Sequence, residues 1–254
     1  MGFAIGVTGV GGGSLMTPLL LLFGYPAPIA IGTDLLYAAI TKAGGVVSHH
    51  MQGNVDWKVV GLLAGGSMPI SILVHACLLN GALQASARFD AVLTQSLGLM
   101  LIITAFILIY RNKLRAAAIK GRPKPVMRAL HKQRQLATLL MGMLLGLCVT
   151  LSSVGAGAFG AAILLTIYSQ TPAVRIIGTD IAHAVPLTFI AGLGYLVGGF
   201  VDMKLLLSLL IGSLPAIRLG SRVSEEIPEQ LLQRLLTALL MGLGGYYSIA
   251  GARI

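Results

Sequence analysis

The chain has 254 residues, of which 56% are hydrophobic and 10% are charged. Soluble domains carry about 25% charged residues, and the 18 basic and 8 acidic side chains of this chain are too few to cover the surface of one. The composition also excludes a disordered chain and a small disulfide-stapled secreted module. It therefore predicts a protein whose surroundings are largely lipid.

Apolar stretches follow one another along the chain, separated by short segments with turn residues. They cover about residues 3–23, 29–48, 57–79, 91–110, 136–168, 177–199, 203–221 and 231–250. A helix needs about 20 apolar residues to cross a bilayer, whereas a membrane β-strand needs about ten residues of alternating polarity. These lengths predict an all-α polytopic membrane protein with about eight transmembrane helices.

Half of the basic residues lie in one segment that contains no acidic residue: Arg111, Lys113, Arg115, Lys120, Arg122, Lys124, Arg128, Lys132 and Arg134. A basic segment between two apolar stretches is typical of a cytoplasmic loop. This distribution favours a membrane topology over nucleic-acid binding. With four spans before the segment and four after it, both termini are expected to be cytoplasmic.

The sequence contains an internal repeat. Motifs of the first half recur in the second half at a constant separation in residue number, which we call the repeat offset. The tetrapeptide Ile-Gly-Thr-Asp at 31–34 recurs at 177–180, and Val-Asp at 55–56 recurs at 201–202. We therefore expect two homologous four-helix repeats, 1–110 and 136–254, joined by a basic cytoplasmic loop, 111–135. Duplicated membrane halves are typical of transporters, whose substrate site lies at the midplane between the repeats.

The relative orientation of the two repeats depends on the first segment of each. Four full spans per half would make the repeats parallel. A glycine-broken first segment that enters and leaves by the same face would make the number of crossings odd and the repeats inverted. The sequence leaves both arrangements open.

Glycine interrupts the first predicted helix of each repeat. Gly11, Gly12 and Gly13 precede Ser14 in the first repeat, and Gly157 takes the position of Gly11 in the second. Broken backbone at membrane depth is tolerated where it faces protein or a watery cavity, and free N–H groups at a helix N-terminus bind anions. We expect these residues to bind substrate; the alternative is close helix packing through small residues.

A Thr-Asp pair lies inside an apolar stretch of each repeat, as Thr33-Asp34 and Thr179-Asp180. A carboxylate at membrane depth costs at least about 2.5–3.5 kcal/mol, which favours a functional role. We expect the hydroxyls to contact the substrate and the aspartates to carry protons. The structural alternative is capping of a helix N-terminus.

Two other ionisable residues follow these aspartates. Lys42 lies two helical turns beyond Asp34 and is a candidate anion ligand, a partner of Asp34, or a side chain that extends to the headgroups. His183 follows Asp180 by three residues, so both share a helix face; it is a candidate pH sensor or a buried, hydrogen-bonded histidine. The two cysteines show no metal-ligand spacing, and no metal or cofactor is expected.

Together these motifs resemble the sulfite exporter TauE/SafE family, also called the toluene sulfonate uptake family. The resemblance covers about 1–110 and 136–250 and rests on the glycine run with Pro18, Pro26, Gly32-Thr33 and Gly53-Asn54-Val55-Asp56-Trp57-Lys58. It implies a carrier of sulfur-containing or small organic anions in the bacterial inner membrane. Asp34 stands where many members have Ser, which favours proton coupling.

We expect a secondary transporter of a small anion, with sulfite or an organosulfonate as the first candidate substrates. The expected partners are this anion and the lipid bilayer; nucleic acid is not expected, and self-association into a homo-oligomer is left open. A passive channel for small anions or neutral solutes is the alternative. An enzyme is not expected, because HExxH, GxSxG and paired metal ligands are absent.

Overall fold

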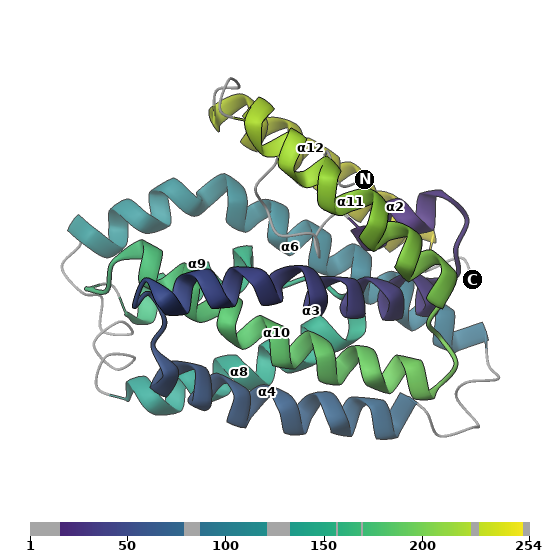
Figure 1. Cartoon of the computed structure of the whole chain (residues 1–254), viewed down its shortest axis with the longest axis horizontal. Helices are drawn as coiled ribbons and strands as arrows, with labels where there is room; N and C mark the ends of the chain where they lie inside the picture. Colours follow the sequence, from purple (N-terminus) through teal and green to yellow (C-terminus); the bar gives the residue numbers. More distant parts are fainter. Residues whose placement is uncertain are drawn as a thin grey trace.

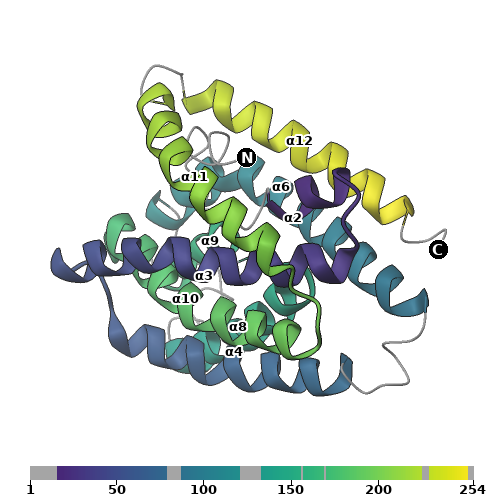
Figure 2. The ribbon, with the colours of Figure 1, turned by 45° about the vertical axis from the view of Figure 1, so that its right-hand side comes forward.

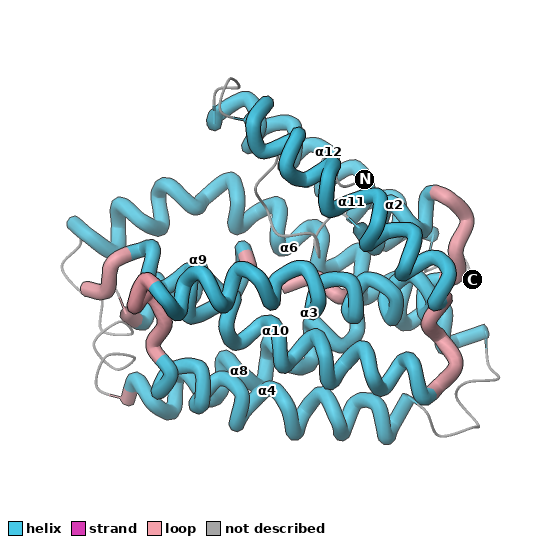
Figure 3. The backbone as a smooth tube through the Cα atoms, viewed as in Figure 1, coloured by secondary structure: helices cyan, strands magenta, loops and turns pink. Residues whose placement is uncertain are grey.

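The computed structural model describes residues 16–78, 87–120, 133–155, 157–168, 170–224 and 229–250. All regular secondary structure within these ranges is α-helical (Figure 3). Three helices in the described part of the chain are long and apolar enough to cross a membrane: α4 (Trp57–Leu78), α8 (Arg134–Ser152) and α10 (Ala173–Val197). The prediction of a helical protein with membrane-spanning helices is confirmed for the described residues.

The remaining helices are α2 (Met16–Leu22), α3 (Ala27–Met51), α6 (Ala87–Lys120), α9 (Ala158–Ile167), α11 (Met203–Ser224) and α12 (Glu229–Ala250). The bounds of α3 and α10 are separated by the repeat offset at both ends, as are those of α4 and α11. The α6 helix continues beyond the boundary expected at residue 110 and includes the start of the basic segment.

Prolines and glycines set the ends of the two central helices. Pro26 and Pro172 immediately precede α3 and α10, where the fixed φ of proline suits helix entry. Gly53 and Gly199 adopt φ of 69° and 77° just beyond the other ends, a region that glycine occupies without a steric penalty. The same residue types thus start and stop both helices.

The α3 and α10 helices pack against each other in the middle of the molecule (Figures 1 and 2). The α4 helix packs on α8 and α10, and α12 packs on α6. Leu35, Leu63, Leu145 and Leu187 from four of these helices belong to one buried cluster. Large apolar side chains also face outward, among them Phe23, Val197 and Ile211, as expected of a surface in contact with lipid.

The apolar stretch 136–168 forms two helices that make a hairpin. After α8, Ser153 adopts a left-handed φ of 57°, and Gly155 and Gly157 have φ of 126° and 127°. The chain then returns through α9, and the hydroxyl of Tyr168 lies 2.9 Å from that of Thr138 in the second turn of α8. This segment therefore enters and leaves at the same end of the bundle.

The packing of α12 on α6 determines at which end of the bundle α12 ends. Gly98 of α6 lies against Ser248 and Gly244 lies against Ile102, so α6 and α12 are antiparallel. The end of α12 is therefore opposite to the end of α6 and the start of α8 (Figure 1). The expectation that both termini are cytoplasmic counted the stretch 136–168 as one crossing, whereas its two helices return to the end of the bundle at which α8 starts. The N-terminus lies outside the described residues.

Candidate functional site

Asp34 of α3 is fully buried and joins three parts of the chain. Its Oδ2 atom accepts a hydrogen bond of 2.6 Å from the hydroxyl of Thr17 in α2 and one of 2.9 Å from the hydroxyl of Ser153. Ser153 lies in the turn of the α8–α9 hairpin and comes from the second half of the chain. The carboxyl group of Asp34 is therefore positioned by both halves.

Asp180 of α10 is also buried, and it faces the start of α9. Its carboxyl group accepts a backbone hydrogen bond from Gly157. The Cα atom of Gly160, one turn into α9, lies so close that a Cβ atom there would collide with Oδ1 of Asp180. The structure therefore brings together two residues predicted for the site, Gly157 and Asp180, at the glycine-rich helix break.

The two aspartates share a cationic neighbour. Lys42 of α3 interacts electrostatically with both Asp34 and Asp180. Within the described residues, Oδ1 of each aspartate is buried without a hydrogen-bond partner. Buried polar atoms in proteins are nearly always satisfied by protein or water, so the two oxygens stand out as atoms that a bound proton or a water molecule would satisfy.

Thr33 and Thr179 use their hydroxyl oxygens to hold loops. Thr33 accepts a hydrogen bond of 3.3 Å from the backbone N–H of Asp202, and Thr179 accepts one of 2.9 Å from the N–H of Asp56. Each acceptor and its donor belong to opposite halves of the chain. The helices that follow these loops, α4 and α11, are capped by Asp56 and Asp202 themselves. Contact of the two threonine hydroxyls with a substrate stays a prediction.

The glycines before these threonines make the matching close contacts. A Cβ atom on Gly32 would collide with the carbonyl oxygen of Phe200, and one on Gly178 would collide with that of Asn54. Phe200 and Asn54 are themselves separated by the repeat offset. Both Gly-Thr pairs therefore bring a loop of the opposite half against α3 or α10.

His183 belongs to a further pair of contacts that link the two halves of the chain. Its Nε2 atom lies 2.8 Å from the hydroxyl of Ser67 in α4. At the two positions separated from these by the repeat offset, the hydroxyl of Tyr37 donates to that of Ser213 over 2.8 Å. His183 is thus a buried, hydrogen-bonded histidine between α10 and α4, and it also interacts electrostatically with Lys42.

Sequence reasoning missed two residues of the site, Thr17 and Ser153. The counterpart of Thr17 in the other half is Ile163, and that of Ser153 is Val7, so the repeat did not mark either position. Gly11, Gly12, Gly13 and Ser14 lie outside the described residues, and their role stays a prediction. Within the described residues, no group of three or more His, Cys, Asp or Glu side chains could hold a metal ion.

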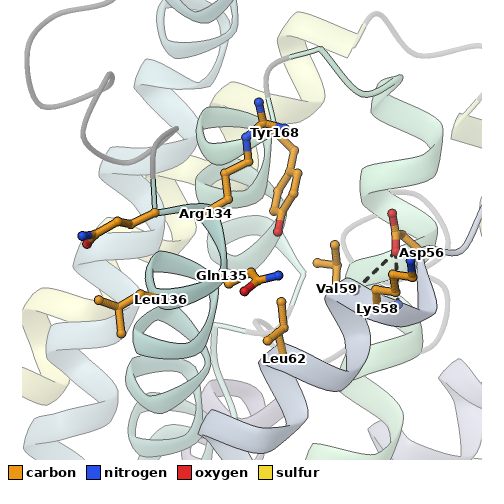
Figure 4. Close-up of a pocket in the computed structure, with 9 residues that line it drawn as sticks. Asp56, Lys58, Val59, Leu62, Arg134, Gln135, Leu136 and Tyr168 are labelled. Carbon is orange, nitrogen blue, oxygen red and sulfur yellow. Dashed lines mark hydrogen bonds between the residues drawn. The ribbon is translucent and has the colours of Figure 1, made fainter.

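A pocket of about 620 Å³ opens at the end of the bundle where α8 starts (Figure 4). It lies among the starts of α4 and α8 and the residue that follows α9, and is lined by Asp56, Lys58, Val59, Leu62, Gln133, Arg134, Gln135, Leu136 and Tyr168. Asp56 caps α4 through the N–H groups of Lys58 and Val59 and lies 3.8 Å from Arg175. The other charged side chains of the pocket are basic, which favours anions.

Comparison with known proteins identifies relatives over nearly the whole chain. The family model described as "Sulfite exporter TauE/SafE" matches residues 1–247. The chain is 36% identical to the "Probable membrane transporter protein YjnA" of Bacillus subtilis (strain 168), over 95% of this chain and 93% of that protein. It is 28% identical to the "Probable membrane transporter protein YdhB" of the same organism, over 96% and 95%. No solved structure matches the chain.

Proposed function

Because the chain belongs to the sulfite exporter TauE/SafE family, we propose that this membrane transporter is a proton-coupled secondary carrier of a small anion. Sulfite and organosulfonates are the first candidate substrates. The observation that carries the proposal is the meeting of a broken helix with two buried aspartates from different halves, Asp34 and Asp180. Discontinuous helices of this kind form the substrate and ion sites of many secondary transporters.

The chemistry of the site suits an anion that travels with a proton. Lys42 supplies a positive charge, and the N-terminus of α9 supplies backbone donors next to Gly157. An anion that approaches two carboxylates is repelled until at least one of them is protonated. Binding of a proton and binding of an anion therefore favour each other, which is the energetic requirement for coupled transport.

An alternating-access mechanism follows from an inverted arrangement of the halves. We take 1–110 and 136–254 as two repeats, and the first segment of the second is the α8–α9 hairpin, which returns to the side from which it starts. The reciprocal contacts of Thr33 with Asp202 and of Thr179 with Asp56 support this arrangement. In such transporters, one repeat rocks against the other around a fixed site.

In this proposal the protein lies in the bacterial inner membrane with the basic segment 111–135 in the cytoplasm. The pocket at the start of α8 is then a cytoplasmic entrance, where Lys58 and Arg134 attract anions. The C-terminus lies on the periplasmic side, because α10, α11 and α12 cross after the hairpin.

The proposal is tested with purified protein in liposomes loaded with a pH-sensitive dye. A gradient of sulfite or sulfoacetate is expected to drive proton movement in the wild type. Asp34→Asn and Asp180→Asn keep the side-chain shape without a titrating group, and we expect both to lose this movement. Dye signals equal to that of the wild type in both variants would disprove the coupling. Flux without proton movement, at rates far above those of carriers, would identify a passive channel instead.

A further inference from the structure

One face of α4 carries polar side chains through an otherwise apolar helix. Ser67, Ser71 and His75 are spaced four residues apart and are all buried, so they lie in a row along about 12 Å of the helix. They face α8 and α10, since Thr150 of α8 donates a hydrogen bond of 2.8 Å to Ser71 and the ring of Tyr195 packs edge-on against His75. Polar residues in a transmembrane span are costly and mark functional paths.

The two ends of this row differ in depth. His75 lies in the last turn of α4, at the end of the bundle opposite to the start of α8. Ser67 lies two turns deeper, where its hydroxyl is 2.8 Å from Nε2 of His183. His183 is three residues from Asp180, on the same helix face. The row therefore extends from one end of the bundle to the central aspartate.

The hydrogen bonds of His75 define its tautomer. Nδ1 lies 2.9 Å from the carbonyl oxygen of Ser71, which can only accept, so Nδ1 carries the proton and Nε2 has a free lone pair. Nε2 is buried without a partner among the described residues, as are Nδ1 of His183 and Oδ1 of Asp180. Buried polar atoms are nearly always paired with protein or with water, so three unpaired atoms along one row point to water as their partner. Glycine leaves space beside two of them, since a Cβ atom on Gly194 would collide with the His75 ring and one on Gly160 with Oδ1 of Asp180.

We propose that the face of α4 formed by Ser67, Ser71 and His75 is a water-filled proton route to Asp180. The proposal rests on the proton coupling proposed above. A hydronium ion at the bundle end gives a proton to Nε2 of His75 and becomes water; the imidazolium releases that same proton to the next water along the row, and Oδ1 of Asp180 accepts it at the end. Every proton taken up at the bundle end is thus delivered to the carboxylate.

The groups that face the route from each neighbouring helix suit this role. Tyr195 of α10 is the ionisable side chain in ring contact with His75, and its hydroxyl donates to the carbonyl of Thr150. The α8 helix contributes the hydroxyl of Thr150. At the deep end, His183 faces Ser67, shares its helix face with Asp180 and interacts electrostatically with Lys42 of α3.

The other half lacks this row in its sequence. The positions that correspond to Ser67, Ser71 and His75 are Ser213, Ile217 and Ser221, so an aliphatic residue interrupts the series and the histidine is missing. Protons would therefore reach the centre from the end of the bundle where α4 ends. With the basic segment in the cytoplasm, this is the periplasmic side.

Water access can be measured without any knowledge of the substrate. In a Cys77→Ser/Cys148→Ala background, Ser71→Cys is treated with Ag⁺ and the remaining free thiol is alkylated after unfolding. We expect Ser71→Cys to react at least tenfold faster than Ile72→Cys, the matched control, since Ile72 is 58% exposed on the outer face of α4. Equal rates in samples with the same thermal transition as the wild type would overturn the route, whether or not the protein transports sulfite.

The role of His75 is tested by comparing two modes of sulfite transport in liposomes. His75→Gln is expected to reduce uptake driven by a pH gradient at least tenfold, while exchange of labelled for unlabelled sulfite, which moves no net proton, stays within twofold of the wild type. Loss of both modes to the same extent, or of neither, would overturn the role of His75. Absence of sulfite exchange in the wild type would count against the proposed substrate only, and the Ag⁺ measurement would still decide the route.

Discussion

Thr33 and Thr179 perform the same task at equivalent positions of the two halves, each accepting a hydrogen bond from the backbone of the loop that precedes α11 or α4 in the opposite half. Two side-chain contacts also pair the halves in both directions: Tyr37 of the first half bonds to Ser213 of the second, and His183 of the second half bonds to Ser67 of the first. The contacts between the halves are therefore exchanged in pairs. Such reciprocity is expected when two similar units meet about a two-fold axis.

Removal of one of these hydroxyls is expected to reduce stability. Thr179→Val keeps the shape and leaves the N–H of Asp56 without its acceptor, which costs about 1–3 kcal/mol. Thr188→Val is the matched control, because among the described residues the Thr188 hydroxyl bonds to carbonyl groups of its own helix. Thermal unfolding in detergent should show a larger loss for Thr179→Val. An equal or smaller loss than that of Thr188→Val would contradict a linking role.

A methyl group at Gly178 is expected to separate α10 from the loop before α4. Gly178→Ala directs its Cβ atom at the carbonyl of Asn54 and the ring of His49, and overpacking of this kind costs about 1–3 kcal/mol. Gly61→Ala and Gly65→Ala are controls within a helix, since a Cβ atom at either position has open space. These controls should be neutral or stabilising by about 0.5–1 kcal/mol. The measurement is thermal unfolding, and a stabilised Gly178→Ala would refute the close contact.

The hydroxyl of Thr17 is expected to hold Asp34 in place for transport. Thr17→Val removes the donor at 2.6 Å and should slow proton-linked sulfite uptake in liposomes about tenfold, a loss that corresponds to about 1.4 kcal/mol. Thr17→Ser retains the hydroxyl and should keep most of the activity. If the serine variant is as slow as the valine variant, packing of the Thr17 methyl group and not its hydrogen bond would be the cause.

The hairpin makes a prediction about topology. A reporter fused after Lys120 and a reporter fused after Ala250 should lie on opposite sides of the membrane, because α10, α11 and α12 follow a segment that returns to its own side. Paired alkaline phosphatase and green fluorescent protein fusions measure this in intact bacteria. Activity of the same reporter at both positions would mean that 136–168 crosses the membrane, contrary to the turn at Ser153 and Gly157.

The sequence alone determined the character of the protein and predicted that its two halves are related. Apolar stretches of about 20 residues predicted membrane helices, because the transfer of such a segment to lipid depends on its composition and length and not on its neighbours. The constant repeat offset likewise predicted that Asp34 and Asp180 would be equivalent, and the bounds of α3 and α10 carry the same offset.

Only the tertiary structure decided how the stretch 136–168 is divided and which groups meet. Hydropathy is continuous through this stretch, whereas the reversal of direction depends on the backbone conformation of a few residues around Ser153. The partners of Thr33 and Thr179, and one partner of Asp34, are distant in the sequence and belong to the opposite half. A residue type and its local spacing show that a polar group needs a partner; the packing of distant helices selects which one it finds.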